Sequence, residues 1–325
     1  MSEGVKTIGV LTSGGDAPGM NAAIRAVVRQ SLFNGVYVKG VKKGYLGLLN
    51  EEIIDMNANS VSDIIQQGGT ILGTARCMEF HTIEGQQKAA EICRKHEIDG
   101  LVIIGGDGSY RGGLALSAQG INVICLPGTI DLDIACTDYT IGFDTAVNTA
   151  LEAIDKIRDT SSSHERISVI EVMGRNAGYI ALWCGIASGA EEILLPEKYD
   201  YNDQKIIQHI MENRDHGKRH NIIINAEGIG HSTSMARRIE VATGIEARAT
   251  ILGYMQRGGS PTCKDRMYAS IMGAMASDMI CQGKTNRVMA HSGGAFIDID
   301  IEEALQMKKE IPDYEYKISR SLSIH

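Results

Sequence analysis

The amino-acid sequence predicts a doubly wound α/β fold with mainly parallel sheets. Three features indicate it: short continuous apolar runs, glycine-rich bends that follow these runs directly, and segments of helical period between them. Glycine is abundant and proline is scarce, with 37 and 5 of the 325 residues, and the glycines gather behind the apolar runs. At about 150 residues per domain, this length fits two domains or one large unit.

The apolar runs are uninterrupted, as in strands that are buried on both faces of a parallel sheet. They cover residues 7–12, 101–104, 122–126, 167–173 and 221–225. Residues 21–32 and 145–159 have a helical period, and in the second segment one apolar stripe contains Val147, Ala150, Leu151, Ile154 and Ile157. Ligands of such sheets bind at the carboxyl ends of the strands, so the bends there are the candidate sites.

Charge and composition narrow the class of protein. Lys and Arg number 32 against 40 Asp and Glu, and the net charge of −8 disfavours a protein that binds nucleic acid through charge. Hydrophobic residues make up 43% of the chain, as in an ordinary globular protein. No apolar run reaches the ~18 residues of a membrane span and the amino terminus shows no apolar signal segment, so we expect a cytoplasmic protein without a membrane partner. The seven cysteines include no Cys-x-x-Cys pair, which favours reduced thiols.

Two glycine-rich bends have the composition of phosphate-binding turns. Residues 13–16 follow the first apolar run and precede a predicted helix, whose start would add positive partial charge to the glycine N–H groups. Taken alone, this bend is explained equally well as a tight turn with nothing bound. Residues 105–109 place Asp107 among glycines, where a carboxylate could hold Mg²⁺ while N–H groups face phosphate oxygens. Two such bends at one sheet edge favour a phosphate site.

A third bend, residues 127–133, follows the run that ends at Leu126 and contains two aspartates. Asp131 and Asp133 alternate, so in an extended segment both carboxylates would face the same side, one as a base and one toward a cation. An aspartate-rich surface turn is the alternative. The two neighbouring bends favour a role of these aspartates in acid–base chemistry over a surface turn.

Five arginines lie beside glycines or at the ends of predicted strands. Their guanidinium groups match the geometry of phosphate oxygens, although any one of them is more often a solvated surface residue. Their concentration near the bends suits a doubly phosphorylated pair of reactants. They are Arg76, Arg166, Arg175, Arg248 and Arg257.

Five long motifs resemble those of the bacterial ATP-dependent 6-phosphofructokinases, in the same order and over nearly the whole chain. They cover residues 9–25, 102–110, 127–146, 159–175 and 253–261. The resemblance implies a glycolytic kinase, a homotetramer of subunits with two doubly wound α/β domains, that moves the ATP γ-phosphoryl group to the 1-hydroxyl of fructose 6-phosphate. It places an ATP-binding domain at 1–142 and 256–305, and a sugar-phosphate-binding domain at 143–255 and 306–325.

The resemblance also implies roles for individual residues. Asp131 would accept the proton of the sugar hydroxyl, with Asp133, Arg175 and Thr129 as the other catalytic residues, and Asp107 would hold Mg²⁺ in the same cavity. ATP would contact Gly15, Arg76, Cys77, Gly106, Asp107, Gly108 and Ser109. Glycines at 108 and 128 resemble the ATP-using rather than the pyrophosphate-using type. The sugar phosphate would contact Thr129, Ile130, Asp131, Met173, Gly174, Arg175, Glu227, Tyr254, Met255, Gln256 and Arg257, with Arg166 and Arg248 reaching it from a neighbouring subunit.

The chain departs from the family pattern at several positions. Leu132 stands where an asparagine is usual and Tyr254 where a histidine is usual, so we expect reduced turnover and weaker or altered sugar binding. ADP or phosphoenolpyruvate as effector would use Arg25, Arg29, Arg158, Glu191 and Lys218. Ala58 and His216 replace an arginine and a lysine, which predicts feeble allosteric control. Two rivals stay open: a sugar-phosphate kinase with a shifted acceptor or donor, and a weakly catalytic regulatory paralogue.

Overall fold

The computed structural model describes residues 5–200 and 202–323, and the chain in it divides into two compact units. Unit 1 comprises Met1–Ile130, Ile134–Thr145 and Arg257–Lys309, and unit 2 comprises Asp131–Asp133, Ala146–Gln256 and Glu310–His325. Residues 1–4 and 324–325, at the ends of the two predicted domains, lie outside the described residues.

A mainly parallel sheet forms the centre of unit 1. Its strands are β1 (Thr7–Thr12), β2 (Tyr37–Val41), β3 (Ile53–Met56), β4 (Gly100–Gly105), β5 (Asn122–Thr129), β6 (Ile141–Gly142), β11 (Arg287–Ser292) and β12 (Ala295–Asp300). They are ordered β12-β11-β5-β4-β1-β2-β3, with β6 beside the end of β5, and only the outer pairs β2–β3 and β11–β12 are antiparallel among the described pairings. Thr12 pairs with Ile104 and Ile104 with Leu126, so β1, β4 and β5 end at the same edge.

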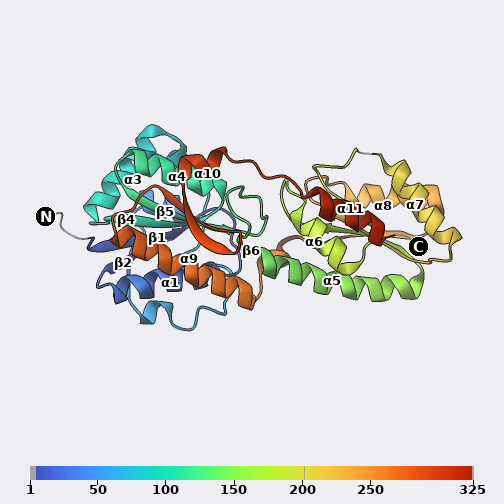
Figure 1. Ribbon diagram of the computed structural model, residues 1–325, viewed down its shortest axis with the longest axis horizontal. Helices are drawn as coiled ribbons and strands as arrows, with labels where there is room; N and C mark the ends of the chain where they lie inside the picture. The colour runs from blue at the N-terminus through green and yellow to red at the C-terminus, as the bar shows by residue number, and fades with distance from the viewer. Residues whose placement is uncertain (1–4, 201, 324–325) are drawn as a thin grey trace. The chain divides into compact units, whose positions relative to one another are not determined.

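Helices cover both faces of this sheet (Figure 1). They are α1 (Met20–Phe33), α2 (Gly44–Leu49), α3 (Ile83–Lys95), α4 (Asp107–Ala118), α9 (Cys263–Cys281) and α10 (Ile301–Gln306), with 3₁₀ turns η1 (Asn59–Val61) and η2 (Glu79–His81). One face packs on α2, α3, α4 and α10 through residues such as Leu101, Ile103 and Leu116, and α1 and α9 pack together on the other. The apolar runs are continuous because both faces of each strand are buried.

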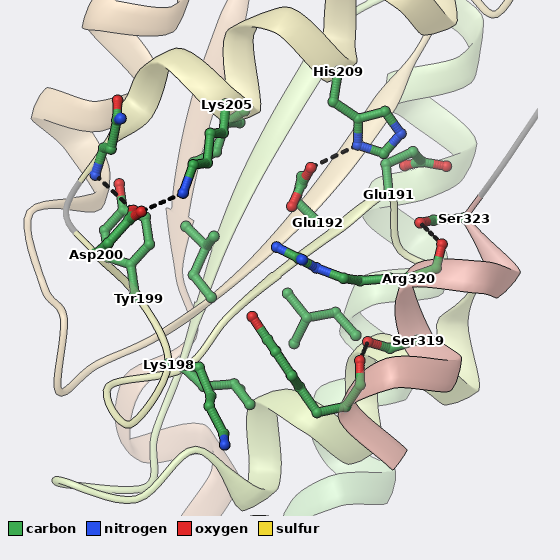
Figure 2. A pocket seen from close by; sticks show the side chains of 16 residues that line it. Glu191, Glu192, Lys198, Tyr199, Asp200, Lys205, His209, Ser319, Arg320 and Ser323 are labelled. Atoms are coloured by element: carbon green, nitrogen blue, oxygen red, sulfur yellow. Dashed lines mark hydrogen bonds and ion pairs between the residues drawn. The ribbon is translucent and has the colours of Figure 1, made fainter. Parts of the chain in front are cut away.

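Unit 2 contains a smaller, fully parallel sheet. Its strands are β7 (Ile167–Val172), β8 (Glu192–Leu194), β9 (Asn221–Ala226) and β10 (Ala247–Ile251), ordered β10-β7-β9-β8. The helices are α5 (Phe143–His164), which starts in unit 1, α6 (Tyr179–Ser188), α7 (Asp203–Asp215), α8 (Ser232–Thr243) and α11 (Asp313–Leu322), and η3 (Gly253–Arg257) is a 3₁₀ turn. Ile206 of α7 and Ile239 of α8 pack on one face of the sheet. Helix α11 packs on α6, and a cavity of about 290 Å³ lies among α11, β8 and α7 (Figure 2).

The predicted elements are confirmed, with two corrections near the third bend. All five apolar runs are strands and both helical segments are helices. The predicted end of one strand at Leu126 is wrong, because β5 continues through Thr129 and pairs there with β6. The predicted extended course of residues 131–133 is also wrong: Leu132 has a φ of 55°, in the left-handed region, so the alternation that would align the two carboxylates is broken.

Two further expectations bear on the class of protein. All seven cysteines are free thiols, as the scattered spacing predicts. Across residues 5–200 and 202–323, every helix is too short or too polar to span a bilayer.

Candidate functional site

In unit 1, the first two glycine-rich bends lie against each other at the carboxyl edge of the sheet. The Ser13 N–H group donates to the carbonyl of Ile104 over 2.9 Å. A Cβ atom at Gly105 would lie 2.4 Å from the carbonyl oxygen of Ser13, so only glycine allows this approach. The expectation that both bends share one sheet edge is confirmed.

The second bend leads directly into α4 and leaves space in front of its first turn. The N–H groups of Ser109 and Tyr110 are bonded to the carbonyl of Gly106, at 2.8 and 3.1 Å. Apart from its chain neighbours and the backbone of its own helix, a Cβ atom at Gly108 would meet no described atom within 4 Å. Asp107 is the first residue of the helix, where the positive end of the helix dipole favours an anion. The open turn can therefore accept phosphate oxygens.

Arg257, the last residue of η3, lies against the first bend. Its Nη1 donates to the carbonyl of Asp16 over 2.9 Å. A Cβ atom at Gly15 would come within 2.6 Å of the same nitrogen. Gly15 thus makes room for a guanidinium group that is held at the carboxyl edge of the sheet of unit 1.

The segment with Arg76 and Cys77 approaches the same edge through Thr12, which the sequence analysis did not single out. The buried Thr12 hydroxyl donates to the carbonyl of Gly73 over 2.9 Å and lies 2.9 Å from the Thr70 hydroxyl. Arg76 is exposed and Cys77 is half-buried. A threonine at the end of an apolar run carries no signal that distinguishes this role from ordinary strand packing.

A buried carboxylate that the sequence analysis missed supports Thr129 at the end of β5. Thr129 pairs with Gly142, and Asp265 of α9 accepts hydrogen bonds from the Gly142 and Thr145 N–H groups at 2.7 and 2.9 Å. The hydroxyls of Tyr139 and Thr145 also donate to Asp265. Burial raises the pKa of Asp265 although these bonds oppose the shift. Asp265 therefore fastens β6 and the first turn of α5 beside Thr129.

In unit 2, a sharp bend after β7 brings together Gly174, Arg175 and Glu227. Gly174 and Arg175 have φ angles of 138° and 56°, and their N–H groups donate to Glu227 Oε1 at 3.2 and 2.5 Å. The Met173 N–H group donates to Oε1 of the buried Gln256 over 3.2 Å. Residues from the ends of β7 and β9 and from η3 therefore form one cluster, as predicted.

Two other sugar-site candidates are exposed, and the two aspartates of the third bend are more enclosed. Tyr254 and Met255 are exposed, with 83% and 51% of their surfaces accessible. Asp131 is buried and Asp133 is half-buried. Burial, with the charges of Glu197 and Asp133, raises the pKa of Tyr179 to about 12.

Arg166 and Arg248 lie at the opposite edge of the second sheet from Glu227. Arg166 precedes β7 and Arg248 is the second residue of β10, so both mark the amino ends of the strands. Each contacts the carboxylate of Glu246, at 2.8 and 2.7 Å. The structure brings these two arginines together, but not with Glu227 of the same chain.

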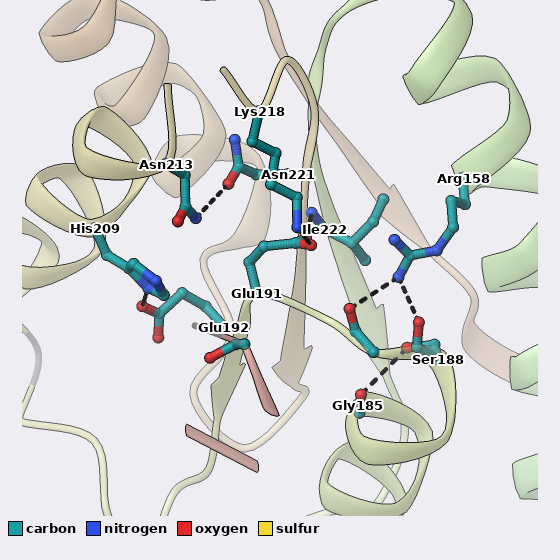
Figure 3. Close-up of polar contacts among 12 residues, drawn as sticks. Arg158, Gly185, Ser188, Glu191, Glu192, His209, Asn213, Lys218, Asn221 and Ile222 are labelled. Atoms are coloured by element: carbon teal, nitrogen blue, oxygen red, sulfur yellow. Dashed lines mark hydrogen bonds and ion pairs between the residues drawn. The ribbon is translucent and has the colours of Figure 1, made fainter. Parts of the chain in front are cut away.

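Three predicted effector residues gather at that amino edge (Figure 3). Arg158 donates to the carbonyls of Ser188 and Gly189, at 2.6 and 3.3 Å. The buried Glu191 pairs with Lys218. The other two predicted residues, Arg25 and Arg29, are on α1 of unit 1, where partial burial and then the charge of Arg29 lower the pKa of Arg25.

Comparison with known proteins identifies the family of this chain. The model of the phosphofructokinase family matches residues 7–280. The chain belongs to this family. The ATP-dependent 6-phosphofructokinase of Clostridium botulinum strain Hall is 57% identical over 319 residues, which cover 98% of this chain and 100% of that relative. The enzyme of the same name from Clostridium acetobutylicum is 56% identical over 320 residues, again 98% of this chain and 100% of the relative.

The fold of the family is shared as well. The structure of phosphofructokinase from Saccharomyces cerevisiae superposes with a TM-score of 0.84 at 34% identity. The match covers 98% of this chain and 46% of the yeast chain. The predicted doubly wound α/β class is thereby confirmed.

Proposed function

We propose that this chain transfers the γ-phosphoryl group of ATP to the 1-hydroxyl of fructose 6-phosphate, giving fructose 1,6-bisphosphate and ADP in glycolysis. The observation that carries the proposal is the 57% identity to ATP-dependent 6-phosphofructokinases over nearly the full length. The uncrowded first turn of α4 at Gly108 leaves access for a nucleotide tail, and the cluster of Gly174, Arg175 and Glu227 offers polar groups for a sugar. The glycolytic reaction fits a cytoplasmic location.

The nucleotide would bind to the first and second bends. Gly15, Gly106 and Gly108 would present backbone groups to its phosphates, with Ser109 beside them, since phosphoryl transfer depends mainly on positioning and on stabilising charge. Arg76 and Cys77 would approach it from the segment that Thr12 holds. Ala or larger side chains at Gly105 would push the two bends apart.

Asp107 suits Mg²⁺. No group of three or more His, Cys, Asp and Glu residues with metal-binding geometry occurs in residues 5–200 and 202–323. A lone carboxylate still fits, because Mg²⁺ in phosphotransferases takes one or two carboxylates and fills its other positions with phosphate oxygens and water. When bound, Mg²⁺ would neutralise charge on the phosphates of ATP.

Asp131 would accept the proton of the sugar 1-hydroxyl, and Asp133, Thr129 and Arg175 would orient the reacting groups. A base held inside the protein keeps one orientation, and Asp131 is buried. Met173, Gly174, Glu227 and Gln256 would position the sugar, with Ile130, Tyr254 and Met255 along its binding surface.

Arg166 and Arg248 would bind the 6-phosphate of the sugar that occupies the site of a neighbouring subunit in a homotetramer. Their place at the amino edge, away from Glu227 of their own chain, supports a role in another subunit. Glu246 would keep the two guanidinium groups together. Arg158, Glu191 and Lys218, with Arg25 and Arg29, would bind ADP or phosphoenolpyruvate as effector, weakly because Ala58 and His216 supply less positive charge.

Replacing Asp131 tests the catalytic assignment. We expect Asp131→Ala to lower kcat by about two orders of magnitude or more with little change in ATP affinity, because a positioned base contributes ~10²–10⁴-fold. Coupled kinetics and equilibrium ATP binding measure the two quantities. Asp138→Ala, at an exposed aspartate of the same connection, is the matched control and should keep its activity. Near-normal turnover of Asp131→Ala would contradict the assignment.

A kinase with a shifted acceptor or donor is the second candidate, and Leu132 and Tyr254 favour it. Leu132 adopts a φ of 55°, which asparagine tolerates better than leucine, and Tyr254 is largely exposed. Rates with fructose 6-phosphate or sedoheptulose 7-phosphate, each with ATP or pyrophosphate, separate the two candidates. We expect ATP with fructose 6-phosphate to be fastest.

A further inference from the structure

The cavity of unit 2 has the size and lining of a small-molecule site. Its volume of about 290 Å³ is close to the lower end of ligand pockets, ~300 Å³. Ile193, Leu195 and Ile206 supply an apolar part of the lining, and α11 contributes Tyr316 and Arg320.

Most charged groups around this cavity are already paired. His209 lies 2.6 Å from Glu192 and Lys205 lies 2.5 Å from Asp200. Glu191 pairs with Lys218, and Lys198 with Asp313 at 2.9 Å. The acidic side chains of the lining therefore do not give the cavity an uncompensated negative charge.

Arg320 is the exception. Its side chain extends from α11 into the cavity, and the guanidinium carbon lies 5.6 Å from the centre of the Tyr316 ring (Figure 2). It forms no ion pair with a carboxylate of residues 5–200 or 202–323. An alternative role for Arg320 is to stabilise the carboxyl end of α11 through the helix dipole. That role does not explain why the side chain extends into a cavity with an apolar lining. A guanidinium beside an apolar lining is the arrangement that binds an oxyanion on a small carbon skeleton.

We propose that this cavity binds a small organic anion, a carboxylate or a phosphate monoester on a short apolar body. Arg320 holds the anionic group through paired N–H donors, and Ile193, Leu195 and Ile206 contact the body. The site is made by unit 2 alone. It goes beyond the proposed phosphoryl transfer and does not depend on it.

Three probes of equal chain length test the proposal on the full-length protein: pentanoate, pentyl phosphate and neutral 1-pentanol. Ligand-observed NMR or calorimetry measures their dissociation constants without any turnover, so failure here is distinguishable from failure of the proposed function. We expect at least one anion to bind roughly tenfold or more tightly than 1-pentanol. If only pentanoate or only pentyl phosphate binds more tightly than 1-pentanol, that result identifies which anionic group the site binds.

Two substitutions locate the binding. Arg320→Gln should remove the advantage of the anion over 1-pentanol, and Arg320→Lys should keep part of it; circular dichroism checks that the fold is kept, as expected for an exposed side chain. Lys198→Gln is the matched control, because Lys198 is already paired with Asp313. Anion binding that survives Arg320→Gln, equal binding of 1-pentanol, or no anion binding at concentrations on the order of 10 mM would each overturn the proposal.

Discussion

Gly105 and Gly108 are three residues apart, yet the chain around them tolerates a side chain very differently. A Cβ atom at Gly105 would collide with the carbonyl of Ser13, whereas one at Gly108 would meet no described atom within 4 Å. The first glycine is required by packing. The second leaves room that the proposed function assigns to ATP phosphates.

Gly108→Asp is therefore expected to raise the KM for ATP by roughly tenfold or more, because its carboxylate would repel the phosphates. The fold should not suffer, since an acidic residue in the first turn of a helix is favourable. Steady-state kinetics with ATP as the varied substrate measure the effect.

Gly108→Ala separates charge from size. Alanine adds the same Cβ atom without charge and improves helix propensity by about 1 kcal/mol, so the KM for ATP should stay near that of the unaltered chain. Equal KM values for ATP in the Asp variant and the unaltered protein would show that the nucleotide does not bind at this turn.

At the scale of elements, His209 ties α7 to the start of β8. Its ring nitrogen lies 2.6 Å from Glu192, and this hydrogen bond is the main cause that raises the pKa of His209 above its usual value. A raised pKa in the folded state contributes stability that is fully present below the unfolded pKa, about 6.5, and is lost as pH rises through the folded value.

His209→Gln should therefore lower the free energy of unfolding by more at pH 6 than at pH 9. We expect the change in this difference to be at most about 1 kcal/mol, because the pair is partly exposed. Urea denaturation at both pH values measures it. In a Glu192→Gln background the same substitution should lose most of its pH dependence, and an undiminished dependence there would refute the pairing.

At the scale of the whole molecule, we have proposed that two subunits complete each sugar-phosphate site, and the separation of Arg248 from Glu227 supports this proposal. Arg248→Ala and Asp131→Ala should each be nearly inactive alone. Co-expressed, they should form mixed tetramers in which about a quarter of the sites carry both intact side chains, because each site draws the two residues from different chains.

Specific activity of the purified mixture, compared with each parent, measures this complementation. Parents mixed after purification, without subunit exchange, provide the control. Activity of the co-expressed sample no higher than that of the parents would place Arg248 in the site of its own chain, contrary to the proposal.

Much of the site was visible before the structure because it depends on local patterns. Continuous apolar runs followed by glycines place Gly15 and Gly105 at strand ends, and the parallel register then brings the ends together. Asp265 and Thr12 were missed because their partners lie far along the chain: Asp265 binds residues more than a hundred positions away, and Thr12 binds Gly73. That Asp107 and Asp131 face one cavity stays a prediction.

Residue order alone was enough for the α/β class, the strands, the free thiols and the family motifs, since each follows from short-range periodicity or composition. Tertiary structure decided the left-handed backbone of Leu132, the placement of Arg257 at Gly15 and the carboxylate that fastens β6 beside Thr129. These depend on which side chains meet after the chain has folded, and steric exclusion and burial between distant segments leave no periodic trace in the sequence.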